Sequence, residues 1–194
     1  MSVIFQPLGR TVAAGFVLVI ILMGVTGKLP ALAEHAHWAF LMRFLHVACG
    51  VMWVGLLWYF NFVQIPSMPK IPDEQKPAVG KVIAPAALFW FRWAALATWL
   101  TGAWYLARSG NFQGSFALGM LSDPVNYYQF VIGIGAWLGT IMLFNVWVLI
   151  WPNQKKILGI VAATDEEKAA ARKMAMLASR TNFVLSIPML LCMG

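Results

Sequence analysis

Long apolar runs separated by short polar stretches are the dominant pattern of this chain. A helix that crosses a membrane needs about 20 mostly apolar residues, and the runs have that character. The predicted spans cover residues 11–27, 38–64, 82–107, 127–151 and 181–194, the last being short for a full crossing. The runs are continuous rather than alternating, which favours helices over barrel strands. We therefore predict an all-α fold: a polytopic integral membrane helical bundle of about five transmembrane helices, forming one membrane domain over residues 1–194.

The first run resembles a secretory signal, because Arg10 precedes it and Ala31-Leu32-Ala33 behind it has the small residues of a cleavage site. Its apolar core is somewhat long for a signal. We interpret it as a retained first span.

Three connections have distinct compositions. The stretch 65–81 is rich in proline and is predicted to be an ordered, non-helical loop. The stretch 108–126 is rich in Gly, Ser and Asn and is predicted to be a loop with a short interfacial segment around 116–121. The stretch 155–180 is predicted to be a polar cytoplasmic loop that carries a helix, since Thr164 to Glu167 has the arrangement of a capping box.

Composition supports the membrane assignment, with 61% hydrophobic and 11% charged residues. The net charge of +7 does not indicate a nucleic-acid partner, because membrane proteins concentrate Lys and Arg in their cytoplasmic loops. Ten basic residues lie in the N-terminus and in the second and fourth connections: Arg10, Lys70, Lys76, Lys81, Lys155, Lys156, Lys168, Arg172, Lys173 and Arg180. Only Lys28 and Arg108 lie in the first and third connections. This asymmetry predicts a cytoplasmic N-terminus.

The second span carries a polar stripe. At a 3.6-residue period one face collects Arg43, His46, Gly50, Trp53, Leu57, Asn61 and Gln64. Ionisable groups inside a membrane are expensive and mark functional sites by default. Gly50, one turn from His46, removes side-chain bulk where a flat group or a second helix could approach. Two interpretations of His46 stay open: a functional group, or a helix-packing histidine that bonds a carbonyl or a water.

Arg92 is the permanently charged side chain deepest within a predicted span. The predicted topology places it in the inner half of the membrane with five amides: Asn61, Gln64, Asn145, Asn153 and Asn182. We hypothesise that they form a pocket for a small planar anion with several hydrogen-bonding edges. His46 would lie above this pocket as a proton acceptor or a ligand. The alternative is that the amides only fasten helices together, as is common in membrane bundles.

The histidines limit metal and haem chemistry. His35 and His37 lie at the mouth of the second span, and His46 is the third and last histidine, so no metal site is predicted. No cofactor follows with certainty from the sequence. A b-type haem with His46 as one axial ligand is an alternative, but no other predicted span supplies a second histidine.

Four segments resemble the membrane domain of the PuuD-type urate hydroxylase (urate oxidase) family: RFLHVACGVMWVGLLWYFNFVQIP, APAALFWFRWAALATWLTG, NVWVLIWPNQKKI and SRTNFVLSIPML. The resemblance begins near Trp38 and extends to the C-terminus. It implies oxidation of urate to 5-hydroxyisourate in a bacterial inner membrane. The positions within shared motifs are His46, Gly50, Trp53, Gly55, Asn61, Arg92, Asn145, Asn153 and Asn182. Family members pass the electrons to a C-terminal cytochrome c domain; this chain has no C-x-x-C-H, so the resemblance implies a separate cytochrome c.

On this interpretation His46 and Arg92 are the candidate catalytic residues. The candidate substrate-binding residues are Asn61, Gln64, Asn145, Asn153 and Asn182, and the expected partners are membrane lipid, a urate-like anion and cytochrome c. The alternative function is a non-catalytic or haem-carrying accessory subunit of a larger membrane electron-transfer complex. A transporter for a purine-like anion is disfavoured, because no internal repeat is visible.

Overall fold

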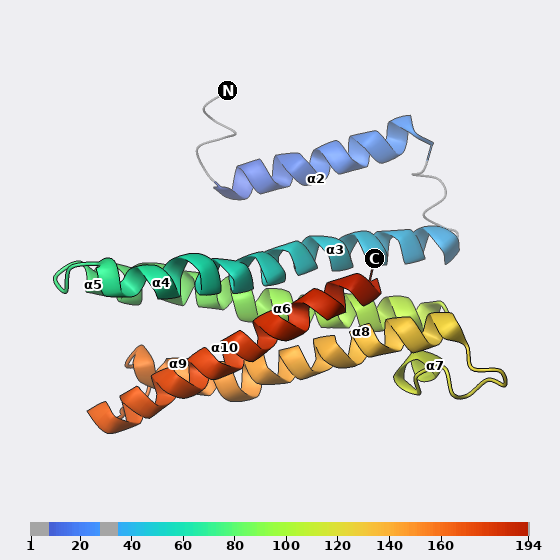
Figure 1. Ribbon diagram of the computed structural model, residues 1–194. Helices are drawn as coiled ribbons and strands as arrows, with labels where there is room; N and C mark the ends of the chain where they lie inside the picture. The colour runs from blue at the N-terminus through green and yellow to red at the C-terminus, as the bar shows by residue number, and fades with distance from the viewer. Residues whose placement is uncertain (1–7, 28–34, 194) are drawn as a thin grey trace. The chain divides into compact units, whose positions relative to one another are not determined.

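The computed structural model describes residues 8–27 and 35–193, which form helices and turns and contain no strand (Figure 1). The predicted all-α fold is confirmed. Five helical stretches are long and apolar enough to cross a membrane: Leu8–Val25, Trp38–Lys70, Lys76–Arg108, Tyr127–Ile157 and Asp165–Met193. The signal-like residues 31–33 lie outside the described residues.

The chain divides into two units, residues 1–41 and 42–194. The first unit contains α2 (Leu8–Val25), an apolar helix with no buried residue. The boundary falls within α3 (His35–Tyr59), so most of this helix belongs to the second unit. The second unit continues with η2 (Phe60–Gln64), α4 (Ile65–Ser67), η3 (Met68–Lys70), α5 (Lys76–Ala78), η4 (Val79–Ile83), α6 (Ala84–Arg108), α7 (Phe112–Phe116), α8 (Tyr127–Phe144), η5 (Asn145–Ile150), α9 (Trp151–Ile157) and α10 (Asp165–Met193).

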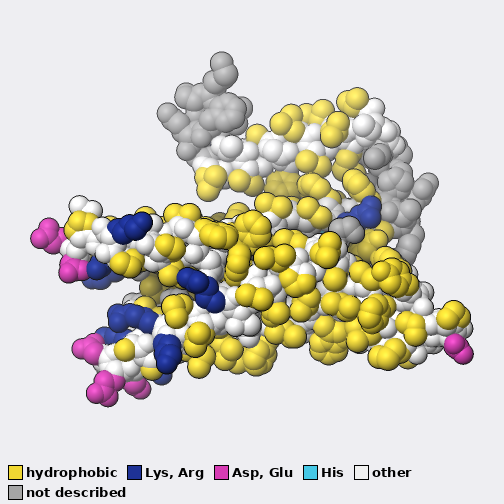
Figure 2. Space-filling model, in the orientation of Figure 1, with side chains coloured by type: hydrophobic (Ala, Val, Ile, Leu, Met, Phe, Trp, Pro, Cys, Tyr) yellow, Lys and Arg dark blue, Asp and Glu magenta, His cyan; other side chains and the backbone are white. Residues whose placement is uncertain are grey.

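Four long helices of the second unit, α3, α6, α8 and α10, run side by side (Figure 1). Trp53, Leu57, Phe91 and Met142 are fully buried between them. Large apolar side chains also cover the outside, and the charged side chains gather mainly at the end that carries α4, α5 and α9 (Figure 2). An apolar surface with charge at its end fits a bundle that contacts lipid.

Three π-helical segments precede prolines. η2, η4 and η5 are each followed by one residue and then by Pro66, Pro85 or Pro152. In an α-helix a proline ring clashes with the carbonyl one turn earlier, and a π turn provides extra room at that point. The predicted non-helical loop over 65–81 is therefore wrong: within it only residues 71–75 lie outside helical turns.

Two further boundaries differ from expectation. The short helix in the third connection is α7, which ends where the predicted interfacial segment begins. The polar helix of the fourth connection and the last apolar run form one helix of 29 residues, α10, because no helix-breaking residue separates them. Its start at the predicted capping box is confirmed, since Thr164 N donates to Glu167 Oε2 and Glu167 N donates to Thr164 Oγ1.

Glycines bring α8 close to its neighbours, as their spacing predicts. A Cβ at Gly133 would overlap the backbone of Ser115 in α7. A Cβ at Gly135 would lie 3.0 Å from side-chain atoms of Cys192 and Met193 in α10. The close approach of the helices therefore depends on glycine at these two positions.

An amide pair also joins α10 to the end of α8. Asn182 is fully buried; its Nδ2 donates to Met142 O at 3.0 Å, and its Oδ1 accepts from Asn145 Nδ2 at 2.8 Å. The Asn182 amide thus donates to the Met142 carbonyl close to the point where α8 changes into the π-helix η5.

Replacing Asn182 with Leu should destabilise the protein, because Asn145 Nδ2 would lose its acceptor in an apolar interior and the Met142 carbonyl would lose its side-chain donor. We expect a loss of about 1–2 kcal/mol in the free energy of unfolding, measured by denaturation in mixed micelles. Asn153→Leu is the matched control, since Asn153 Nδ2 bonds Leu149 O of its own helical stretch and joins no second helix. Equal stability of the Asn182 variant and the wild type would contradict this role.

Candidate functional site

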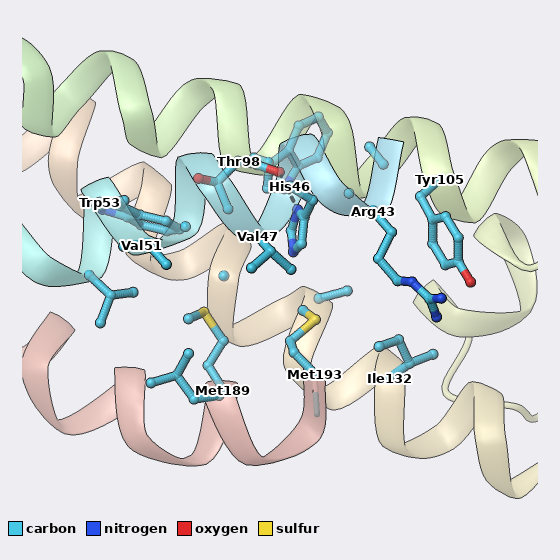
Figure 3. A pocket seen from close by; sticks show the side chains of 18 of the residues that line it. Arg43, His46, Val47, Val51, Trp53, Thr98, Tyr105, Ile132, Met189 and Met193 are labelled. Atoms are coloured by element: carbon cyan, nitrogen blue, oxygen red, sulfur yellow. Dashed lines mark hydrogen bonds between the residues drawn. The ribbon is translucent and has the colours of Figure 1, made fainter. Parts of the chain in front are cut away.

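A cavity of about 530 Å³ lies between α3, α6, α8 and α10 (Figure 3). Most of its lining is apolar, including Trp53, Trp99 and Phe116. Its polar groups are few and include Arg43, His46 and Tyr105. Sites for small molecules and cofactors have this composition: an apolar chamber with a small number of placed polar groups.

His46 projects from α3 into this cavity (Figure 3). Its Nδ1 lies 2.7 Å from the Thr98 carbonyl oxygen of α6. A carbonyl oxygen only accepts hydrogen bonds, so Nδ1 carries the proton and donates it. In the neutral ring Nε2 then keeps its lone pair, and it is free to act as a proton acceptor or as a ligand.

Gly102 of α6 makes room for the His46 ring. A Cβ at position 102 would lie 2.8 Å from Cε1 and 2.9 Å from Nδ1 of His46, closer than non-bonded atoms approach. Thr98 and Gly102 are four residues apart, so the carbonyl that orients the ring and the gap that accepts it lie on one face of α6. The predicted spacer, Gly50, also lines the cavity, but a Cβ there would make only an ordinary contact of 3.7 Å with Thr98.

The ends and walls of the cavity differ in chemistry. Arg43 lies one turn from His46 on α3, and its guanidinium extends toward the Tyr105 side chain of α6 (Figure 3). On the opposite wall α10 contributes Met189 and Met193 (Figure 3). The cavity therefore combines one cationic end with a thioether-bearing wall.

Arg92 lies elsewhere, against the ring of Trp151. Its guanidinium carbon is 3.8 Å from the ring centroid, and it also lies 5.3 Å from the centroid of Phe89. No ion pair to Arg92 is present within the described part of the chain. The hollow beside it has a volume of about 10 Å³ and is bordered by Gln154. The structure thus places the large cavity at His46 rather than around Arg92.

The five predicted amides do not converge on Arg92 as one hydrogen-bonded cluster. Asn145 and Asn182 bond each other. Asn61 Nδ2 bonds Ser179 Oγ at 3.0 Å and Leu57 O at 2.9 Å. Asn153 bonds the backbone of its own helical stretch. Asn61 Oδ1 and Gln64 Oε1 are buried without a partner among the described residues. Much of the amide layer fastens helices, while these two oxygens remain able to accept hydrogen bonds.

Sequence reasoning placed His46, Gly50 and Trp53 on one face, and all three line the cavity. It did not identify Thr98 and Gly102, nor the methionines of α10. The sequence shows that Thr98 and Gly102 are four residues apart and so share a face of their helix. It does not show that this face lies opposite His46 of α3. The side chains of His35 and His37 lie outside the described residues.

Comparison with known families gives one match. Residues 128–194, about a third of the chain, match the model of the family described as urate oxidase N-terminal. This segment includes nearly all of α8 and the whole of η5, α9 and α10. The match confirms a relationship to the urate oxidase family over these residues. No curated protein and no solved structure matches the chain.

Replacing Gly102 with Ala should displace the His46 ring and break its bond to Thr98 O, because the added methyl group would overlap the imidazole. Nitrogen-15 NMR of labelled histidine, in a chain with His35 and His37 replaced by Gln, should report one Nδ1-protonated tautomer. The Gly102 variant should give a mixture of tautomers. Gly55→Ala is the matched control, since a Cβ there meets nothing within 4 Å. A single Nδ1-protonated tautomer in the Gly102 variant would show that the glycine does not position the ring.

Proposed function

We propose that this urate oxidase-related chain is a membrane-bound urate hydroxylase-like oxidoreductase that converts urate to 5-hydroxyisourate. Addition of the oxygen of one water to urate releases two electrons and two protons. Two molecules of a separate cytochrome c each accept one electron. The observation that carries the proposal is the match to the urate oxidase family. The matched segment includes Trp151 and Gln154, which lie beside Arg92. It also includes residues of α8 and α10 that line the His46 cavity.

Arg92 is the proposed urate-binding cation. Urate is a planar anion at neutral pH, and a guanidinium can bond such an anion with two parallel N–H groups. Arg92 stacks on Trp151 and has no carboxylate partner among the described residues, so its charge is available to a ligand. Because the adjoining hollow is only about 10 Å³, urate binding requires the guanidinium to move off the Trp151 ring.

Buried amide oxygens supply complementary acceptors. Urate carries ring N–H groups in addition to its oxygens, and such donors need acceptors when water is removed. Asn61 Oδ1 and Gln64 Oε1 are buried acceptors without partners among the described residues. They lie three residues apart in η2, so one short segment supplies both acceptors. Asn145, Asn153 and Asn182 support this layer through the bonds described above.

The proposed electron path runs along α6. Thr98, which holds His46, is six residues from Arg92, or about 9 Å along the helix axis. With a cytoplasmic N-terminus in a bacterial inner membrane, Arg92 faces the inner half and His46 the outer half. Urate then binds near the cytoplasm, and cytochrome c accepts the electrons on the opposite side.

A second candidate function is a haem-carrying accessory subunit of a larger membrane electron-transfer complex. The apolar lining of the His46 cavity favours this function, because such a cavity can hold a redox group whether or not the chain binds urate. In this case a partner protein binds and oxidises urate. The two candidates differ in whether the isolated chain oxidises urate.

Arg92→Leu should raise the KM for urate about tenfold to a hundredfold, because it removes one charge-assisted contact worth about 1.5–3 kcal/mol, while kcat changes less. The measurement is urate-dependent reduction of a soluble cytochrome c by the purified chain in lipid nanodiscs, with two cytochromes reduced per urate. Arg180→Leu is the control for loss of a positive charge at a residue outside the proposed site.

An unchanged KM in the Arg92 variant would remove that residue from the urate site. Absence of urate-dependent reduction by the folded wild-type chain would reject the enzyme and leave the accessory subunit.

A further inference from the structure

We propose that the cavity at His46 holds a b-type haem, with Nε2 of His46 and the thioether sulfur of Met193 as its two axial ligands. The proposal deepens the function proposed above and rests on it, since it names the group that carries the electrons. The haem site is tested spectroscopically without urate, so failure of the site and failure of urate oxidation are distinguishable.

The shape and lining of the cavity favour a flat apolar group. Its volume of about 530 Å³ falls within the usual range for cofactor sites. Gly50, Gly139 and Ala136 leave parts of its walls without bulky side chains, and Trp53 and Trp99 provide flat surfaces. A porphyrin is apolar on both faces. A small polar anion would leave most of its hydrogen-bonding groups unpaired in such a chamber.

His46 has the arrangement expected of an axial ligand. Metal-bound histidines usually donate their second ring N–H to a carbonyl or carboxylate, which fixes the tautomer and the ring orientation. His46 Nδ1 makes such a bond to Thr98 O at 2.7 Å, and Gly102 provides the space in which the ring is held. Nε2 is therefore the nitrogen that donates its lone pair to iron.

The second ligand comes from α10. A methionine sulfur paired with a histidine is an established ligand set for haem iron in electron transfer. Figure 3 shows Met193 on the wall opposite His46 and Met189 one turn further along α10. Met193 packs against Gly135 of α8, and Met189 packs against Gly139. Packing against glycine does not distinguish the two methionines, but Met193 is the one that lies across from His46, so it is assigned as the ligand and Met189 is the matched control.

Arg43 distinguishes haem from a bare metal ion. Cuprous copper also accepts histidine and thioether ligands, but it would bring positive charge toward Arg43 and leave most of the cavity unfilled. Haem carries two propionate carboxylates on one edge. Arg43 and Tyr105, at one end of the cavity, can supply an ion pair and a hydrogen bond to that edge.

The test uses the full chain, produced with a haem precursor and purified in detergent. The wild type should bind about one haem and show a low-spin spectrum with the near-infrared charge-transfer band of iron–thioether ligation. Met193→Leu should keep the haem, lose this band and shift the reduction potential downward. Met193→His should restore a low-spin spectrum at a lower potential than the wild type, because methionine raises the potential relative to histidine. Met189→Leu should keep the band.

Two further variants test the other contacts. His46→Ala should lose the haem, with helix content checked by circular dichroism. Arg43→Leu should release haem to apomyoglobin about tenfold faster, as expected from one lost charge-assisted contact. The proposal is overturned if the folded wild type binds no haem, if it binds copper instead, or if Met193→Leu leaves the spectrum unchanged.

Discussion

Polar groups inside an apolar bundle must find hydrogen-bond partners within the protein, and this constraint accounts for the side-chain hydrogen bonds between the helices. The His46 ring bonds a carbonyl of α6, and Asn182 bonds a carbonyl of α8 and the amide of Asn145. The hydroxyl of Thr98 bonds Ala94 O within its own helix. Each of these bonds fixes a side chain or a helix contact that apolar packing alone would leave less specific.

The same constraint separates two kinds of polar residue. Asn145 donates to Asn182, which in turn donates to Met142 O, and these bonds hold helices together. Asn61 Oδ1 and Gln64 Oε1, in contrast, are buried acceptors without a partner among the described residues. The Arg92 guanidinium lies against the rings of Trp151 and Phe89, and no carboxylate pairs with it in the part of the chain that the structure describes. The amide oxygens of Asn61 and Gln64 lie in η2, whereas the apolar cavity lies at His46. These two places correspond to the substrate site and the electron-transfer site that we propose.

Much of the fold was predictable from the sequence because apolar length alone decides which segments can cross a membrane. The face of α3 that carries His46 followed from helical periodicity. The partners of that face did not, because a 3.6-residue period shows which residues share a side of a helix but not which helix lies opposite. Hence Gly102 and Met193 emerged only from the structure, and the polar groups around Arg92 were expected to form a larger pocket than the structure contains.

The π turns before the prolines affect how insertions and deletions act on this protein. A π turn holds one residue more than an α turn, so deleting one residue within η5 could restore α-helical geometry without lengthening the path of the chain. A full π turn and a full α turn each complete one rotation, so the side chains beyond the deletion would keep their orientation relative to those before it. Trp151 would still face Arg92, and the cavity at His46 would stay intact. The cost would fall on Pro152, because its ring would then meet the carbonyl one turn earlier; the extra residue of η5 therefore accommodates this proline within a continuous helix.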